Sequence, residues 1–206
     1  MIFQKEGDFF MEFKTSETRL NLLRAFAGES QARNRYTFAA SEAKKQNLNV
    51  IERLFTFTAN QEKEHAELFY KALKECSGEN IEICGSYPID ISTNIVDLLK
   101  SAAHNEFEEH NPVYSGFSKI AEEEGFPTIS TLFSQIAEIE KTHGDRFAHF
   151  KELLEQGKLF SNENETKWLC LNCGHIHSAK DAPNVCPVCQ HDQGYFIRYN
   201  EFIVRL

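Results

Sequence analysis

The sequence has no cluster of basic residues and no long uninterrupted apolar stretch. Its 22 Lys and Arg are outnumbered by 31 Asp and Glu, for a formal net charge of −9. Nucleic-acid binding needs clustered positive charge, and Lys44-Lys45 is the one adjacent basic pair. The longest uncharged segment, residues 125–137, contains Ser, Thr, Gln and Pro, whereas a membrane-spanning helix needs about 20 apolar residues. The first residues carry acid and lack the profile of a secretory signal. We therefore expect a cytoplasmic protein that binds neither nucleic acid nor membrane.

Proline is scarce, with 5 residues, whereas Phe occurs 18 times. Apolar residues recur at helical spacing in four segments, residues 17–46, 50–75, 93–124 and 128–156. The first two and the last two are joined closely and the middle link is long, which predicts an all-α, ferritin-like four-helix bundle with one crossover. Pro112 falls inside the third helix, where we expect a kink or local distortion. The acids at 122–124 are interpreted as a solvated helix end.

The composition changes at residues 157–165, which are rich in polar residues and include Gly157. This predicts a bundle domain over 1–156, a linker over 157–165 and a small metal-bound β domain over 166–206. A domain of about 40 residues usually needs a metal, disulfides or a partner to be stable. The third part holds two Cys-x-x-Cys pairs, a spacing typical of a tetrahedral four-sulfur site, and their cysteines are Cys170, Cys173, Cys186 and Cys189.

The spacing of these cysteines leaves zinc and a single iron open as the metal. Zinc would be structural, whereas iron would carry one electron. The two remaining cysteines, Cys76 and Cys84, lie in the crossover. We expect both to be free thiols.

Each predicted helix places a glutamate within its apolar face. Glu62, for example, lies between Phe55 and Phe69 at helical spacing, whereas Glu64 has polar neighbours on its own face. Burying an unpaired carboxylate costs several kcal/mol, so several of them would exceed the ~5–15 kcal/mol stability of an ordinary domain. The sequence therefore predicts cations beside the four inward acids, which are Glu29, Glu62, Glu106 and Glu140.

Two of these acids belong to Glu-x-x-His motifs, with His65 and His143 on the same helix face as the carboxylate. Two such motifs and two further single carboxylates are the set found in di-iron and di-manganese bundles. Oxygen-rich donors with one imidazole per metal suit iron or manganese. The alternative is that these residues form ordinary surface pairs.

The third helix carries a second inward acid, Glu109, three residues after Glu106. A seventh donor would give one metal a choice between carboxylate when ferric and imidazole when ferrous. Alternatively, Glu109 is a solvated residue displaced by Pro112.

Nearly the whole chain resembles the rubrerythrin family, on the segments AFAGESQARNRY at 25–36, EKEH at 62–65, IAEEEGF at 120–126 and WLCLNCG at 168–174. The resemblance implies a dinuclear non-haem iron site, oxo-bridged when oxidised, and a rubredoxin-like Fe(Cys)4 domain. It also implies reduction of hydrogen peroxide to water with electrons drawn from NAD(P)H through a donor such as a rubredoxin or an NAD(P)H-dependent reductase. A head-to-tail homodimer is expected.

The resemblance also implies a role for each matching residue. Glu62 and Glu140 are expected to bridge the irons, and one iron is expected to move between His65 and Glu109. Tyr36 and Tyr114 match tyrosines that bond the carboxylates, although both could be simple core aromatics. The metal ligands implied are Glu29, Glu62, His65, Glu106, Glu109, Glu140, His143, Cys170, Cys173, Cys186 and Cys189.

Two other functions remain open on the sequence alone. A ferroxidase or iron-handling protein needs only the bundle site, and its four-sulfur site could hold zinc. A non-enzymatic electron carrier would need only iron in the four-sulfur site.

Overall fold

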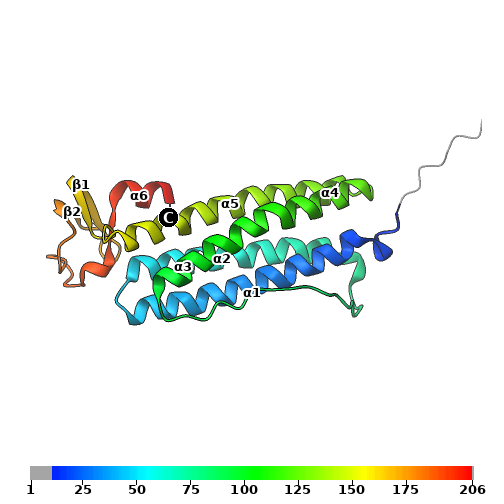
Figure 1. The fold of residues 1–206 in the computed structure, drawn as a ribbon, viewed down its shortest axis with the longest axis horizontal. Coiled ribbons are helices and arrows are strands. Elements are labelled where there is room, and N and C mark those ends of the chain that lie inside the picture. Colours follow the sequence, from blue (N-terminus) through cyan, green and yellow to red (C-terminus); the bar gives the residue numbers. More distant parts are fainter. Residues whose placement is uncertain (1–10, 206) are drawn as a thin grey trace, which may run out of the picture.

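The structure is a computed structural model that describes residues 11–205, and the side chains of residues 11–202. Its main body is a bundle of long helices lying side by side (Figure 1): α1 (Glu17–Lys45), α2 (Asn49–Ala72), α3 (Ile95–Glu108), α4 (Ser115–Glu123) and α5 (Pro127–Glu155). Helix α1 packs along α2, and α3 and α4 pack along α5. The predicted ferritin-like topology is therefore confirmed, with α3 and α4 forming the third member of the bundle.

The third predicted helix is interrupted where the sequence led us to expect a distortion. A π-helical segment, Glu109–Tyr114, separates α3 from α4, and Asn111 within it has non-helical dihedral angles. The peptide bond from Asn111 to Pro112 is cis. Since Pro112 has no N–H to donate to the helix, the backbone departs from α geometry at the point where Glu109 enters the bundle.

The helix ends follow local capping chemistry. The Ser16 hydroxyl accepts a hydrogen bond from the Arg19 amide, 3.1 Å away, at the start of α1, and the Asn94 side chain accepts from the Val96 amide at 2.8 Å at the start of α3. Pro127 occupies the first turn of α5, where its missing N–H costs nothing.

The interpretation of residues 122–124 as a solvated helix end was wrong for Glu124. Its carboxylate accepts hydrogen bonds from the amides of Glu17 and Thr18 at 2.9 and 2.8 Å and from the Thr18 hydroxyl at 2.6 Å. It therefore caps α1 from the far end of α4. Glu122 is exposed, as expected.

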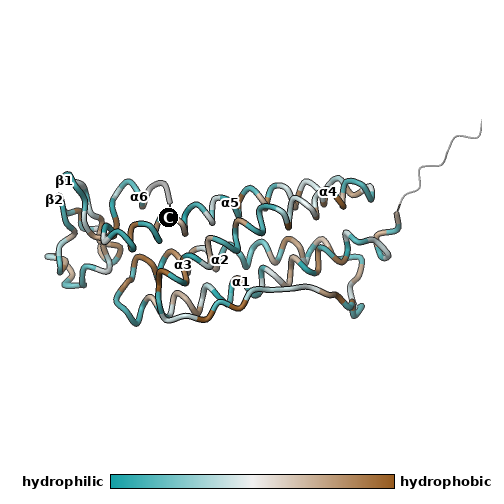
Figure 2. The backbone as a smooth tube through the Cα atoms, viewed as in Figure 1, coloured by the Kyte–Doolittle hydropathy of each residue, from teal (hydrophilic) through white to brown (hydrophobic). Residues whose placement is uncertain are grey.

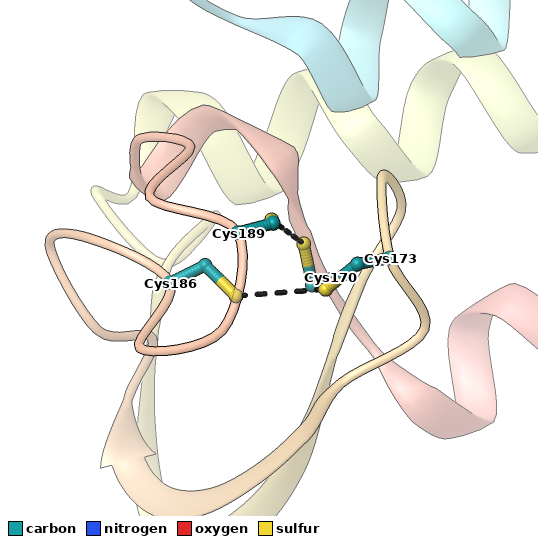
Figure 3. Close-up of side chains that lie close together, drawn as sticks. All are labelled: Cys170, Cys173, Cys186 and Cys189. Carbon is teal, nitrogen blue, oxygen red and sulfur yellow. Dashed lines mark hydrogen bonds between the residues drawn. The ribbon is translucent and has the colours of Figure 1, made fainter.

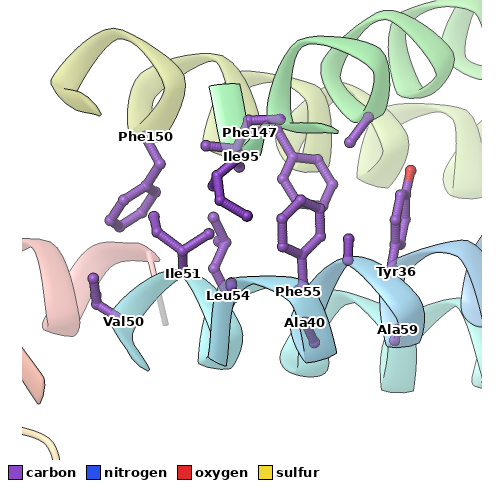
Figure 4. Packing of buried hydrophobic residues seen from close by; sticks show 14 of the residues in the cluster. Tyr36, Ala40, Val50, Ile51, Leu54, Phe55, Ala59, Ile95, Phe147 and Phe150 are labelled. Atoms are coloured by element: carbon purple, nitrogen blue, oxygen red, sulfur yellow. The ribbon is translucent and has the colours of Figure 1, made fainter. Parts of the chain in front are cut away.

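Two aromatic layers fill the interior of the bundle. In one, the rings of Phe55 and Phe147 lie 5.1 Å apart between centroids (Figure 4). In the other, the rings of Phe69 and Phe133 lie 5.1 Å apart. Glu62 lies midway between Phe55 and Phe69 along α2, two helical turns from each, so a polar layer is enclosed by apolar ones. Along the helices, apolar and polar positions interchange repeatedly (Figure 2).

After a short 3-10 turn at Lys74–Cys76, the crossover from α2 to α3 contains no helix or strand and runs along the side of α1 (Figure 1). It exposes Ile89 and Ile91, which are 84% and 92% accessible.

The C-terminal part forms a small antiparallel sheet of β1 (Ser161–Cys170), β2 (Ile176–Asp181) and β3 (Phe196–Arg198), in the order β2-β1-β3, followed by α6 (Tyr199–Arg205). Trp168 and Phe196 are fully buried in its own core. Strand β1 begins inside residues 157–165, the segment that the sequence led us to read as a linker. The division into domains at 156 and 166 stays a prediction.

The small sheet packs against one end of the bundle (Figure 1). Ile197 belongs to the same buried cluster as Val50 and Phe150. Glu201 of α6 pairs with His149 of α5 at 2.9 Å, and a Cβ on Gly194 would lie 1.8 Å from the carbonyl oxygen of Asn47. Close backbone approach at that junction therefore requires glycine.

Candidate metal centres

The polar layer of the bundle is formed by side chains from four helices. These side chains are all buried: the four glutamates and His143 are 0% exposed, and His65 is 6% exposed. They are Glu29 from α1, Glu62 and His65 from α2, Glu106 from α3, and Glu140 and His143 from α5. The structure thus brings together six of the seven bundle residues that the sequence singled out as metal ligands.

The six residues form two overlapping groups, and each group could hold one cation. His65 Nδ1 lies 3.1 Å from Glu62 Oε2 and 2.9 Å from Glu140 Oε1. His143 Nδ1 lies 3.0 Å from Glu62 Oε1 and 2.8 Å from Glu140 Oε2. Both groups share Glu62 and Glu140, each of which presents one oxygen to each imidazole.

The remaining carboxylates complete the groups at their outer ends. Glu29 Oε2 lies 3.9 Å from His65 Nδ1, and Glu106 Oε2 lies 3.5 Å from His143 Nδ1. The two imidazole rings stack with centroids 5.6 Å apart and planes 13° from parallel. The arrangement has an approximate twofold symmetry that relates α1 and α2 to α3 and α5.

Several of these donor atoms are buried without a hydrogen-bond partner. They include Oε2 of Glu29, Oε1 of Glu62, Oε2 of Glu106, both oxygens of Glu140 and both ring nitrogens of His143. Short separations without hydrogen-bonding geometry are expected when donors converge on one cation, since neighbouring ligands at ~2.1 Å from it lie about 3 Å apart. The donor set therefore fits a pair of metal ions.

The pKa values of the carboxyl groups in the polar layer also indicate an excess of buried negative charge. Burial raises the pKa values of Glu29 and Glu140 well above the usual range, and neighbouring carboxylates raise them further. Burial also acts to raise the pKa of Glu62, but its contacts with His143 and His65 outweigh that effect and lower the pKa to about 2. Without cations, some of these acids would hold protons.

Two tyrosines donate hydrogen bonds to the outer carboxylates. The Tyr114 hydroxyl donates to Glu29 Oε1 at 2.5 Å, and the Tyr36 hydroxyl donates to Glu106 Oε1. Burial raises the pKa of both hydroxyls well above the usual range, and Glu106 and Glu29 respectively raise them further. Each hydroxyl therefore keeps its proton and fixes one carboxylate.

Glu109 lies beside the two groups and belongs to neither. It is half-buried at the start of the π-helical segment, and its Oε2 has no hydrogen-bond partner. Burial and the carboxylates of Glu106 and Glu62 raise its pKa. Glu109 is therefore neither fully solvated nor a member of either group, and its role as a metal ligand stays a prediction.

The four cysteines of the C-terminal part converge from the end of β1 and two loops (Figure 3). Cys170 Sγ lies 3.7 Å from Cys189 Sγ, and Cys173 Sγ lies 3.7 Å from Cys186 Sγ. Four sulfurs at ~2.3 Å from a central metal lie roughly 3.8 Å apart in a tetrahedron. Amides donate toward these sulfurs, and that of His191 lowers the pKa of Cys189 to about 5. The cluster fits one tetrahedral metal.

Sequence reasoning missed the contribution of the crossover. Tyr87 lies beside Gly28, which precedes Glu29, and its hydroxyl donates to the Arg24 carbonyl oxygen at 3.1 Å. Periodicity gave no signal for it, because the crossover has none. Of the other two cysteines, Cys76 is buried and Cys84 is exposed, and both are unpaired.

Fold and site together define a ferritin-like protein with a dinuclear metal centre and an appended four-cysteine domain. The rubrerythrin family model matches residues 21–151, and the model of the rubrerythrin rubredoxin-like domain matches residues 168–197. The chain belongs to the rubrerythrin family. It therefore has the di-iron site and the rubredoxin-like four-cysteine site of that family, and it is a metal-binding redox protein.

Curated relatives agree over nearly full length. Rubrerythrin of Clostridium perfringens is 42% identical over 91% of this chain and 97% of its own. Rubrerythrin of Porphyromonas gingivalis is 43% identical over 95% and 96%. Within the described residues, no helix has the length and apolar character needed to cross a membrane.

Solved structures extend the likeness to the fold. Fully reduced nigerythrin superposes with a TM-score of 0.60 at 28% identity and covers 94% of this chain and 95% of its own. A bacterioferritin of Desulfovibrio desulfuricans superposes with a TM-score of 0.61 at 22% identity, over 69% and 82%, which supports the bundle fold alone.

Proposed function

We propose that this protein reduces hydrogen peroxide to two molecules of water, consuming two electrons and two protons. The observation that carries the proposal is a buried layer of carboxylates and imidazoles whose donor atoms lack hydrogen-bond partners, in a chain that also has a four-cysteine site. A pair of irons can deliver two electrons to peroxide, and a four-cysteine iron carries one electron at a time. The pair would therefore be reduced again in two single-electron steps.

The residues proposed to hold the two irons are those of the two groups. Glu29 and His65 would serve one iron, Glu106 and His143 the other, and Glu62 and Glu140 would bridge them. When bound, the irons supply the two electrons that cleave the O–O bond. Aromatic layers pack above and below this site along the bundle.

Protein groups around the site would control charge and position. Tyr36 and Tyr114 fix the outer carboxylates and keep their own protons. Glu109 is proposed as the alternative donor to His65, because anionic oxygen favours the ferric ion and imidazole the ferrous ion. Its position beside the groups, with an unpartnered oxygen, supports that role.

Electrons are proposed to arrive through the four-cysteine site from an NAD(P)H-linked donor. The small sheet docks near Asn47, at one end of the bundle. Glu62 lies thirteen residues along α2 from Asn49, which places it about 20 Å further at 1.5 Å per residue. This separation favours a head-to-tail dimer in which one subunit's sulfur site serves its partner's bundle. A reducing compartment such as the cytoplasm suits the free thiols.

The test is stopped-flow oxidation of the fully reduced, iron-loaded protein, with hydrogen peroxide and dioxygen compared at equal concentration. We expect peroxide to react faster, with two electrons consumed per peroxide. Glu109→Ala is expected to keep its iron content and to turn over peroxide roughly 10-fold or more slowly. Glu122→Ala, at an exposed position in α4, is the matched control.

Faster oxidation by dioxygen than by peroxide would favour the ferroxidase function instead. Stoichiometric zinc and no visible ferric-thiolate absorption in protein isolated from its native host would remove the proposed electron route. Unchanged turnover in Glu109→Ala would retire the donor exchange at Glu109.

A further inference from the structure

The crossover lies over the bundle beside Glu109, and a few polar contacts tie it there. The Arg24 Nε donates to the Cys84 carbonyl oxygen at 2.9 Å, and the Tyr87 hydroxyl donates back to the Arg24 carbonyl oxygen at 3.1 Å. On the other side, the side-chain Nδ2 of Asn105 in α3 donates to Asp90 Oδ2 at 2.7 Å. The segment thus spans from α1 to α3 as a strap across the gap between them.

A cavity of about 350 Å³ lies under this strap. Its walls include Tyr87 and Pro88 from the crossover and Gly28, Glu109 and Tyr114 from the bundle. Tyr114 donates to Glu29, so the inner wall of the cavity is in direct contact with the metal-binding layer. The cavity is far larger than hydrogen peroxide and is wide enough for a drug-sized molecule.

On the inner wall of the cavity, Tyr87 and Glu109 lie close to Gly28. Gly28 is buried, and a Cβ placed on it would lie 3.6 Å from Tyr87 Cε1 and 3.9 Å from Glu109 Oε1. Both distances are ordinary van der Waals contacts for carbon, so one methyl group would fill the space. We call the gap between Gly28, Tyr87 and Glu109 the throat.

The throat matches hydrogen peroxide in size and in chemistry. One methyl group on Gly28 would touch both Tyr87 and Glu109, so we expect an unbranched pair of oxygens to pass and a branched carbon to be held back. Its walls present an aromatic edge and a carboxylate oxygen, which can accept a hydrogen bond from an O–H group. An alkyl hydroperoxide offers a single O–H and a bulky carbon substituent.

From this geometry we infer that the throat is the entry route to the metal site, and that Tyr87 sets its specificity for hydrogen peroxide over alkyl hydroperoxides. The inference rests on the proposed peroxide reduction for the identity of the substrate. The entry route itself is independent of that reaction, because a small inert ligand of the metal site would reach it by the same path.

Two substitutions change the throat in opposite directions. Gly28→Ala fills it with one methyl group and should not weaken α1, because alanine is the better helix former by about 1 kcal/mol. Gly116→Ala in α4 is its matched control, since a Cβ there meets nothing within 4 Å. Tyr87→Ala opens the throat, and Tyr87→Phe keeps the ring and removes the hydrogen bond to Arg24.

The first measurement needs no peroxide chemistry. Azide, a linear three-atom anion, is mixed with the oxidised, iron-loaded protein, and the rate of change of the visible absorption is followed. Gly28→Ala should slow this rate roughly 10-fold or more, the scale on which one methylene alters a tight site. Gly116→Ala should match the unsubstituted protein, with iron content and circular dichroism confirming that each variant is folded and loaded.

The second measurement compares oxidation of the reduced protein by hydrogen peroxide and by cumene hydroperoxide. Tyr87→Ala should raise the rate with cumene hydroperoxide relative to hydrogen peroxide by roughly 10-fold or more, whereas Tyr87→Phe should keep the original preference. An unchanged azide rate in Gly28→Ala, or an unchanged preference in Tyr87→Ala, would overturn the inference. If Gly28→Ala slows azide binding as expected but the unsubstituted protein does not react with hydrogen peroxide, the proposed peroxidase function would be overturned and the entry route would stand.

Discussion

Glu62 and Glu140 differ from the other buried acids because each contacts both imidazoles. Their two oxygens point to opposite halves of the polar layer, whereas Glu29 and Glu106 each contact one histidine and one tyrosine. A carboxylate shared between two cations gains interaction from both, which offsets a burial cost that a single partner would not cover. Metal binding to these residues therefore contributes directly to the free energy of folding.

Removing the metals should therefore reverse the dependence of stability on pH. In the metal-free protein, burial raises the pKa values of Glu29 and Glu140 above their unfolded value near 4.3. The folded state then binds more protons than the unfolded state above that pH, so its free energy of unfolding falls as pH rises. Glu62, with its pKa lowered to about 2, opposes this only on the acid side.

The iron-loaded protein should show the opposite trend, because metal ligands must be deprotonated to bind. Chemical denaturation of metal-free and loaded protein at pH 5, 6 and 7.5 should give a difference that grows with pH to several kcal/mol. In the metal-free protein, Glu29→Gln should flatten the pH dependence, and the exposed Glu64→Gln should leave it unchanged. Parallel curves for loaded and metal-free protein would contradict the argument.

At the scale of elements, the interruption between α3 and α4 lets the third member of the bundle contribute residues both to the metal layer and to the end of α1. The π-helical segment lets Glu109 enter the bundle beside the metal layer, and α4 then resumes with Tyr114 just before it, aimed at Glu29. At its far end, Glu124 caps α1. The residues that flank α4, Tyr114 and Glu124, thus both bind to α1, which is distant in sequence.

The cap predicts a measurable loss of stability. Glu124→Ala removes an acceptor for the amides of Glu17 and Thr18, and we expect it to lower the free energy of unfolding by ~1–2 kcal/mol. Glu122→Ala, at an exposed neighbouring position, should change it by less than about 0.5 kcal/mol. Urea denaturation of the iron-loaded protein measures both. Equal effects of the two substitutions would mean that the cap contributes nothing.

For the whole molecule, the three large apolar side chains with the highest exposed fractions among the described residues lie together on α1 and the crossover. Phe38, Ile89 and Ile91 are 69%, 84% and 92% accessible, and they line a groove that also includes Pro88 and Leu98. Water-exposed apolar groups of this size in one region are typical of a contact surface. The proposed head-to-tail dimer could use this surface.

Sedimentation equilibrium should accordingly give twice the mass of one chain. Replacing Phe38 and Ile91 with Asp should shift the equilibrium to monomer at micromolar concentration, since two buried charges would face an apolar partner. Leu68→Asp on α2, 45% accessible, is the control and should remain dimeric. A dimer that survives the double substitution would place the interface elsewhere.

The sequence by itself determined the bundle, the inward carboxylates and the four-cysteine cluster, because each depends on spacing within one segment. Helical periodicity placed Glu62 between Phe55 and Phe69, and Glu-x-x-His fixed His65 and His143 beside their carboxylates. Only the tertiary structure decided which oxygen of Glu62 faces which histidine, that Glu124 caps α1, and that Tyr87 closes a gap beside Gly28. These contacts join segments far apart in sequence, and the crossover that carries Tyr87 has no periodicity from which its path could be read.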